Sequence, residues 1–144
     1  MAEPLHKLVA SRYAGRNVPV ALVLPVQTGS SAAGGTAGLI TREAPAGGSV
    51  TYTCTAANPG TYAYYSGTRP DLQVEMGLIG AIVVRPSVNP TTQAYNHEDS
   101  AFDHEYLFLL SEIDPKFHEL VQNGNINLVD TTTFFPVYWF INGR

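Results

Sequence analysis

Residues 96–105, NHEDSAFDHE, bring together the side chains in this chain that are best suited to bind a metal. Two imidazoles and several carboxylates could coordinate a divalent cation if the segment folds back on itself. The candidate ligands are His97, Asp99, Asp103 and His104. Because their spacing matches no strong metal motif, we favour a solvated acidic loop over a metal site.

The other reactive side chains are predicted to be structural. Cys54 is the only cysteine, which excludes an intramolecular disulfide and a cysteine-rich zinc site. No histidine lies near it in sequence, so core packing is favoured over a copper-ligand role. His118 is expected on the exposed side of a helix. For Tyr62, Tyr64 and Tyr65, we favour cross-strand packing over an electron relay or a sugar-stacking surface.

Composition narrows the class of protein. The chain has 144 residues, enough for one domain, and only 14% are charged, with 13 Gly and 10 Pro. This composition is typical of a turn-rich β protein. A net charge of -4 without a Lys/Arg cluster argues against nucleic acid or a membrane surface as partner. The first residues show no signal-peptide apolar core, so the sequence assigns no compartment.

Alternating polarity places the first strands. GGSVTYTCTA predicts a half-buried strand with Val50, Tyr52 and Cys54 inward and its threonines outward. Residues 18–26 predict an edge or bulged strand, and QTGSSAAGGTAG, residues 27–38, a small-residue loop. TYAYY predicts a strand that returns after the NPG turn, and GAIVV, residues 80–84, a central strand.

The last third of the chain predicts one helix between two strands. YLFLLSEI, residues 106–113, predicts a strand. Asp114 can cap a helix that starts at Pro115 and ends near Gly124. FFPVYWFINGR predicts a strand that is paired and covered on both sides. The fold class is therefore all-β, a Greek-key β-sandwich with one short helix near the C-terminus. Its predicted core contains Val50, Tyr52, Cys54, Ile82, Val84, Leu107 and Leu109.

The segment GLITREAPAGGSVTYTCTAANPGTYAYYSGTRPDLQVEMGLIGAIVVRP resembles the first plastocyanin-like (cupredoxin) domain of multicopper oxidases. In that family a proline-glycine turn opens a strand of the form G-T-Y-W-Y-H-S-H, and a segment Gln-x-x-Met-G-x-x-G-A-x-x-V follows. EYLFLLSEIDPKFHELV resembles the linker into the next domain, and YWFINGR the first strand of that domain. The resemblance implies a cupredoxin domain over residues 1–112, with 1–18 weakly ordered. Residues 113–144 would be a linker helix and the first strand of a truncated second domain.

The resemblance also implies which positions would bind copper. The family places two His-x-His pairs in this domain, and here they fall on Val23 and Pro25 and on Tyr65 and Gly67. Valine, proline and glycine offer no ligand atom, and a neutral phenol is a poor copper ligand. We therefore expect no metal or other cofactor in this chain, although copper is the cofactor of the family.

Three functions stay open at the level of sequence. The first is a multicopper oxidase-like domain that has lost its copper ligands and acts as a structural or interface module. The second is copper-binding oxidoreductase activity that depends on further domains or on an oligomer. The third is a β-sandwich that binds a small ligand or a protein. The expected partners are other cupredoxin domains or further copies of this chain through exposed strand edges. Relatives are often secreted or periplasmic.

Overall fold

The protein is described by a computed structural model, in which residues 22–23, 28–38 and 41–144 are placed well enough to describe. The predicted irregular segment 1–18 and the predicted ligand position Pro25 lie outside the described residues. So does most of the predicted strand 18–26. Within the described part, no helix is long and apolar enough to cross a membrane.

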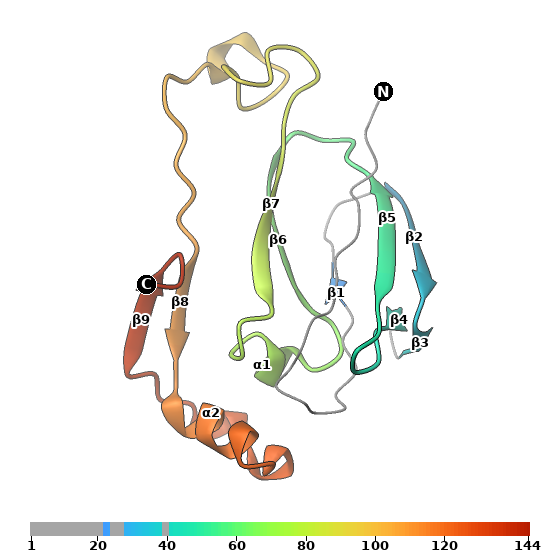
Figure 1. Ribbon diagram of the computed structural model, residues 1–144. Coiled ribbons are helices and arrows are strands. Elements are labelled where there is room, and N and C mark those ends of the chain that lie inside the picture. The colour runs from blue at the N-terminus through green and yellow to red at the C-terminus, as the bar shows by residue number, and fades with distance from the viewer. Residues whose placement is uncertain (1–21, 24–27, 39–40) are drawn as a thin grey trace.

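The described strands form small antiparallel sheets. A three-stranded sheet has the order β1 (Leu22–Val23), β6 (Gly60–Ser66), β7 (Ile79–Val84). A second sheet pairs β2 (Thr28–Gly34) with β5 (Val50–Thr55), and a third pairs β3 (Thr36–Ala37) with β4 (Arg42–Glu43). Figure 1 shows β2 and β5 on one side of the main body and β6 and β7 on the other. The all-β class is confirmed, and the Greek-key order stays a prediction.

Strand β5 follows the predicted alternation. Val50 and Cys54 are buried, Tyr52 is half-buried, and Thr53 and Thr55 are exposed. The hydroxyl of Tyr52 donates a hydrogen bond to the carbonyl of Arg42 at 2.6 Å, and this bond joins β5 to β4. Burial raises the pKa of Tyr52, so the phenol stays protonated and keeps this donor.

Two predictions about strands are wrong. Most of residues 27–38 form β2 and β3 rather than a loop, because β2 supplies backbone partners for β5, with one irregularity between Thr28 and Ser31. GAIVV lies in β7, which pairs only with β6 among the described strands and is an edge strand there. Val83 is accordingly exposed and Ile82 only half-buried.

The predicted helix near the C-terminus is confirmed. Helix α2 spans Pro115–Gln122, and its N-cap Asp114 accepts a hydrogen bond from the backbone N–H of Lys116 at 3.0 Å. Gly124 follows the helix end with φ of 88°, a conformation that glycine adopts without strain. Two short 3-10 turns follow α2, at Ile126–Leu128 and Thr131–Thr133, and another lies in the acidic loop at Glu98–Ser100.

A buried apolar cluster among the described residues joins α2 to α1 (Pro70–Gln73). It contains Leu72, Phe117, Val121 and Val129, and Met76, Leu120, Ile126 and Phe134 pack against it. Phe117 and Phe134 meet with ring centroids 5.7 Å apart. The helix is thus fixed to the main body at the end of β6, next to the elbow between β6 and α1.

The last two strands form a separate two-stranded sheet, with α2 between them in sequence. Strand β8 (Leu110–Ile113) pairs with β9 (Tyr138–Ile141), and Figure 1 shows this pair beside the main body, reached by a long extended segment. The strand predicted over 106–113 is therefore shorter than expected. Leu107 is exposed and Leu109 half-buried, so the prediction that Leu107 is a core residue is wrong. The prediction that residues 134–144 are covered on both sides is also wrong, because Phe135, Val137, Tyr138, Trp139 and Ile141 are exposed.

Candidate functional site

The pairing of β1 with β6 brings two of the four predicted ligand positions together. In the register of β1 and β6, Val23 lies directly opposite Tyr65, and Leu22 opposite Ser66. Opposed residues of an antiparallel pair have their Cβ atoms about 4.5–5.5 Å apart. Ligands placed on both strands could therefore reach one metal centre between them.

The elbow is held by buried polar contacts. Ser66 is fully buried, and its hydroxyl is hydrogen-bonded to the side-chain carbonyl of Gln73, which is also buried. The backbone N–H of Ser66 donates to the carbonyl of Leu78 at 3.1 Å. The hydroxyl of Thr68 donates to the Glu43 carboxylate at 3.0 Å, which connects the elbow to β4. These contacts fix the turn between β6 and α1.

The packing of β6 on β7 requires the glycine at position 80. It lies opposite Tyr64 in the β6–β7 register, and a Cβ atom at Gly80 would overlap the ring of Tyr64. A glycine is needed here because an aromatic ring crosses the backbone of the neighbouring strand. Tyr62 is similarly structural, since its hydroxyl donates to the carbonyl of Asn58 at 3.0 Å. Tyr65 is the most exposed of the three tyrosines, and 36% of its surface is accessible to solvent.

The donor atoms at the elbow do not suit copper. Tyr65 offers a phenol, Ser66 a hydroxyl and Gln73 an amide, whereas copper sites use imidazole, thiolate or thioether, and carboxylate ligands. The carboxylate closest in the hydrogen-bond network, Glu43, is engaged by Thr68. Cys54 is buried in β5 and is 3% exposed, as the alternation predicted. The residues present therefore do not fit a copper ion at this position.

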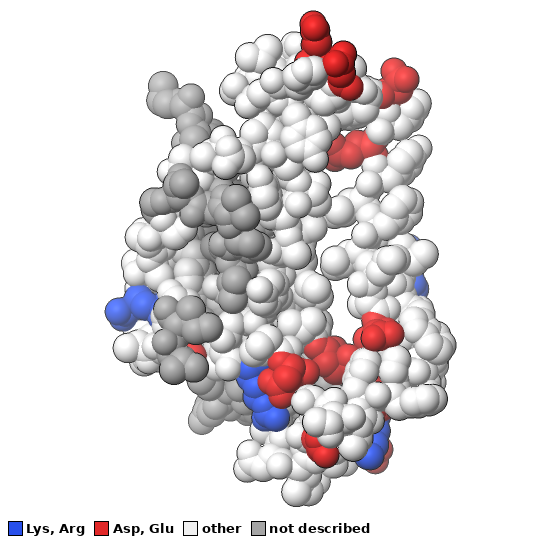
Figure 2. Space-filling view, turned by 180° about the vertical axis from the view of Figure 1, so that it is seen from behind, with Lys and Arg blue, Asp and Glu red and all other residues white. Residues whose placement is uncertain are grey.

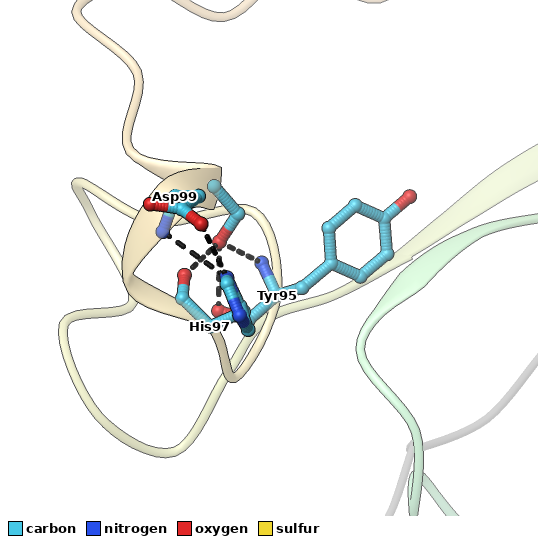
Figure 3. Close-up of polar contacts among 4 residues, drawn as sticks. Tyr95, His97 and Asp99 are labelled. Carbon is cyan, nitrogen blue, oxygen red and sulfur yellow. Dashed lines mark hydrogen bonds and ion pairs between the residues drawn. The ribbon is translucent and has the colours of Figure 1, made fainter.

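The acidic loop places its predicted ligands in separate contacts. Nδ1 of His97 lies 3.6 Å from a carboxylate oxygen of Asp99 and accepts a hydrogen bond from the Asp99 backbone N–H at 3.2 Å (Figure 3). His104 instead stacks on Tyr106, with ring centroids 6.5 Å apart. Within residues 22–23, 28–38 and 41–144, no three His, Cys, Asp or Glu side chains are close enough to hold a metal ion. The candidate ligand set His97, Asp99, Asp103 and His104 stays a prediction.

One bidentate ion pair fixes the base of this loop. The guanidinium of Arg85, directly after β7, donates to both oxygens of Glu105 at 2.7 and 2.6 Å. This contact raises the pKa of Arg85 and ties the end of the loop to the sheet. A cleft then runs between β7 and the extended segment, and Figure 2 shows it as a gap between the main body and a column of mostly uncharged residues.

A cluster of titratable groups between α1 and α2 was not predicted. Nε2 of His118 lies 3.2 Å from a carboxylate oxygen of Glu75, and that oxygen accepts the backbone N–H of Asp114 at 2.8 Å. His118 lies at the helix surface with a side chain that is 37% exposed, as predicted, but its Nε2 atom is buried against Glu75. Burial raises the pKa of Glu75, and its contacts with Asp114 N–H and His118 offset part of that rise.

Sequence offered only a weak signal for this cluster. His118 follows Phe117 and lies three residues before Val121, so it borders the apolar stripe of α2. The position of Glu75 could not be inferred, because it lies on the segment after α1 and meets α2 only in the folded chain. The cluster joins the segment after α1 to the start of α2.

The described strands form an antiparallel β domain with an elbow at the end of β6. Residues 26–89 match the multicopper oxidase family model, a segment that includes β2 through β7 and the elbow. The match supports a multicopper oxidase-like domain and extends further toward the N-terminus than the resemblance noted above. Residues 90–144 lie outside it. No curated protein and no solved structure shows a significant match to the chain.

Proposed function

We propose that this chain is a multicopper oxidase-like cupredoxin domain that has lost its own copper ligands and acts as a structural or interface module. The observation that carries the proposal is the pairing of Val23 with Tyr65. The two strands that would present ligands are opposed as a metal centre requires, and the residues at these positions are poor ligands or none.

The surroundings of the elbow support the same proposal. A buried Ser66–Gln73 hydrogen bond and a tightly packed Gly80–Tyr64 contact keep the elbow in one conformation. Such preorganisation is what a first shell of ligands needs from its scaffold. In this chain it serves the fold alone. Residues 113–144 would then form the linker helix and first strand of a second cupredoxin domain.

Copper content tests the proposal. The purified chain is incubated with Cu²⁺, desalted and measured by elemental analysis, beside the variant Tyr65→His/Gly67→His. Gly67 has a negative φ, so a side chain there adds no backbone strain. Gly67 directly follows the last residue of β6, so the second imidazole would lie at the start of the elbow, two residues from the first. We expect no stoichiometric copper in the wild-type chain and weak binding by the double variant.

A matched control removes the acidic loop as a source of copper. The variant His97→Ala/His104→Ala should lose any loose copper that the wild-type chain carries, because these are the loop's two imidazoles. Tight stoichiometric copper in the wild-type chain that survives this change would contradict the proposal. It would favour the alternative, a copper-binding oxidoreductase whose activity needs further domains or an oligomer.

A further inference from the structure

Two asparagines of this chain are directly followed by a glycine, Asn123 by Gly124 and Asn142 by Gly143. Such a pair is prone to deamidation, because glycine has no side chain to shield its amide nitrogen and adopts backbone conformations that other residues avoid. The nitrogen can then reach the side-chain amide of the asparagine. Every other asparagine is followed by proline or by a larger side chain. The two Asn-Gly pairs are therefore the positions where this reaction should be fastest.

The side chain of Asn142 is held by the fold. Its Oδ1 atom accepts a hydrogen bond from the backbone N–H of Leu109 at 2.8 Å, and its Nδ2 atom donates to the carbonyl of Leu107 at 2.9 Å. The backbone N–H of Asn142 also donates to the carbonyl of Leu109 at 2.8 Å. Both ends of the side-chain amide are thus bonded to a segment that is distant in sequence. The amide must leave both partners before Gly143 can attack it.

Asn123 lacks such a hold. It directly follows α2, and its side chain makes no hydrogen bond to any residue in the described part of the chain. The nitrogen that would attack it, that of Gly124, donates to the carbonyl of Val121 at 3.1 Å. This bond closes the end of a helix, where the last turn opens most easily. Asn142 is exposed as well as Asn123, so the two sites differ in hydrogen bonding rather than in access to water.

We propose that Asn123 is the site at which the folded chain deamidates. The nitrogen of Gly124 attacks the side-chain carbonyl carbon of Asn123, the new N–C bond closes a succinimide ring, and the C–N bond to Nδ2 breaks. Ammonia leaves with the proton that the Gly124 nitrogen gives up. Water then opens the ring at either carbonyl and leaves aspartate or isoaspartate at position 123. No electron is transferred, and water is the only co-reactant.

The product places a negative charge at the end of α2 that tolerates it least. The carbonyl end of a helix carries a partial negative charge, so a carboxylate at the C-cap is unfavourable. Glu119, four residues earlier, would become a like-charge neighbour. Isoaspartate also adds a methylene to the backbone, inside the turn that Asn125 closes by donating to the carbonyl of Leu120 at 2.8 Å. Deamidation of Asn123 should therefore loosen the end of α2.

Ageing of the full chain tests the site. The folded chain is kept at mildly alkaline pH, which favours loss of the proton from the attacking nitrogen, and samples are digested with trypsin. Fragmentation in the mass spectrometer then locates the mass increase along the peptide that contains both pairs. We expect deamidation at Asn123 to be at least about fivefold faster than at Asn142, because one more hydrogen bond must open at Asn142.

The same chain unfolded in urea is the matched control. Both pairs are then free of the fold and should react at similar rates, each faster than in the folded chain. Asn123→Gln places the amide one methylene further from the backbone, where ring closure is slow, and should abolish the fast reaction without a change of charge. Asn123→Asp imitates one product and should unfold at a lower urea concentration than Asn123→Gln. Equal midpoints for these two variants would contradict the expected effect on α2.

Equal rates at the two pairs of the folded chain, or a faster reaction at Asn142, would overturn the assignment, because the hydrogen bonds of Asn142 would then give no protection. The same preference for Asn123 in urea would also overturn it, since neighbouring residues rather than the fold would be the cause. A folded chain that does not react at Asn123 while the unfolded chain does would show that the end of α2 stays closed, which equally contradicts the proposal. None of these results bears on copper content, so the proposed function is tested separately.

Discussion

The last third of the chain places two apolar surfaces side by side that differ in burial. The α2 surface, with Phe117 and Val121, packs on α1 and belongs to a buried apolar cluster. The face of the β8–β9 pair that carries Leu110, Trp139 and Ile141 stays exposed. Both come from strongly apolar sequence, and the difference between them is whether the chain itself supplies a partner. Apolar pattern therefore indicates that a surface needs cover, and only the folded chain shows whether it has any.

The largest expected effect separates two phenylalanines of this region. Phe117→Ala should lower the free energy of unfolding by about 3–5 kcal/mol, because Phe117 is 1% exposed and its removal leaves a cavity against Phe134. Phe135→Ala makes the same change at a side chain that is 74% exposed, and should cost within about 0.5 kcal/mol. Urea unfolding of both variants measures the difference. Equal losses of unfolding free energy would show that Phe135, near β9, is as well packed as Phe117 of α2.

The next effect concerns the polar contact beside α1. Gln73→Leu leaves the buried hydroxyl of Ser66 without its side-chain partner and should cost about 1–3 kcal/mol. Adding Ser66→Ala removes both polar groups and should recover part of that loss, so the double-mutant cycle should show a coupling between the two positions. Additive losses in urea unfolding would contradict a direct Ser66–Gln73 interaction.

The smallest expected effect is a pH dependence of stability that arises from Glu75, at the contact between the segment after α1 and α2. Because the pKa of Glu75 is raised in the folded chain, the folded state holds this proton to higher pH than the unfolded state. The contribution of Glu75 is thus favourable at low pH and is lost as pH rises through its folded pKa. Glu75→Gln does not titrate, so its stability relative to wild type should improve as pH rises from acid to neutral.

Thermal unfolding of both proteins over that range provides the measurement. Repeating the comparison in a His118→Gln background separates the titration of Glu75 from that of the imidazole 3.2 Å away. If the difference in stability between Glu75→Gln and wild type does not change with pH, Glu75 is solvated in the folded chain. The contact between α1 and α2 would then be as open to water at this position as the exposed β8–β9 pair.

Features with a local cause could be predicted from the sequence. The start of α2 follows from Asp114 and Pro115, and the burial of Cys54 from the alternation of β5. The side chains of β2 carry no apolar period, so its pairing with β5 through backbone hydrogen bonds left no trace in the sequence. The prediction that Leu107 is buried was wrong for a related reason. Burial requires a neighbouring element that covers the side chain, and Leu107 lies exposed on the extended segment.

Only the part of the candidate site that lies within one continuous stretch of sequence could be predicted. The elbow positions Tyr65 and Gly67 came from a resemblance of consecutive residues, and the opposition of Val23 to Tyr65 required the register of two distant strands. The contact of His118 with Glu75 depends on how α2 meets α1 and has no counterpart in local pattern. Long-range contacts of single side chains are the part of a site that sequence periodicity does not specify.

Asp114 links several parts of this region through one side chain and one amide. Its carboxylate accepts the backbone N–H of Lys116 at the start of α2 and that of Phe135 before β9, each at 3.0 Å, while its own N–H donates to Glu75. Breaking this junction would release the helix, the approach to the last strand and the α1 segment in a single event. The end of the chain should therefore open as one cooperative unit rather than fray residue by residue.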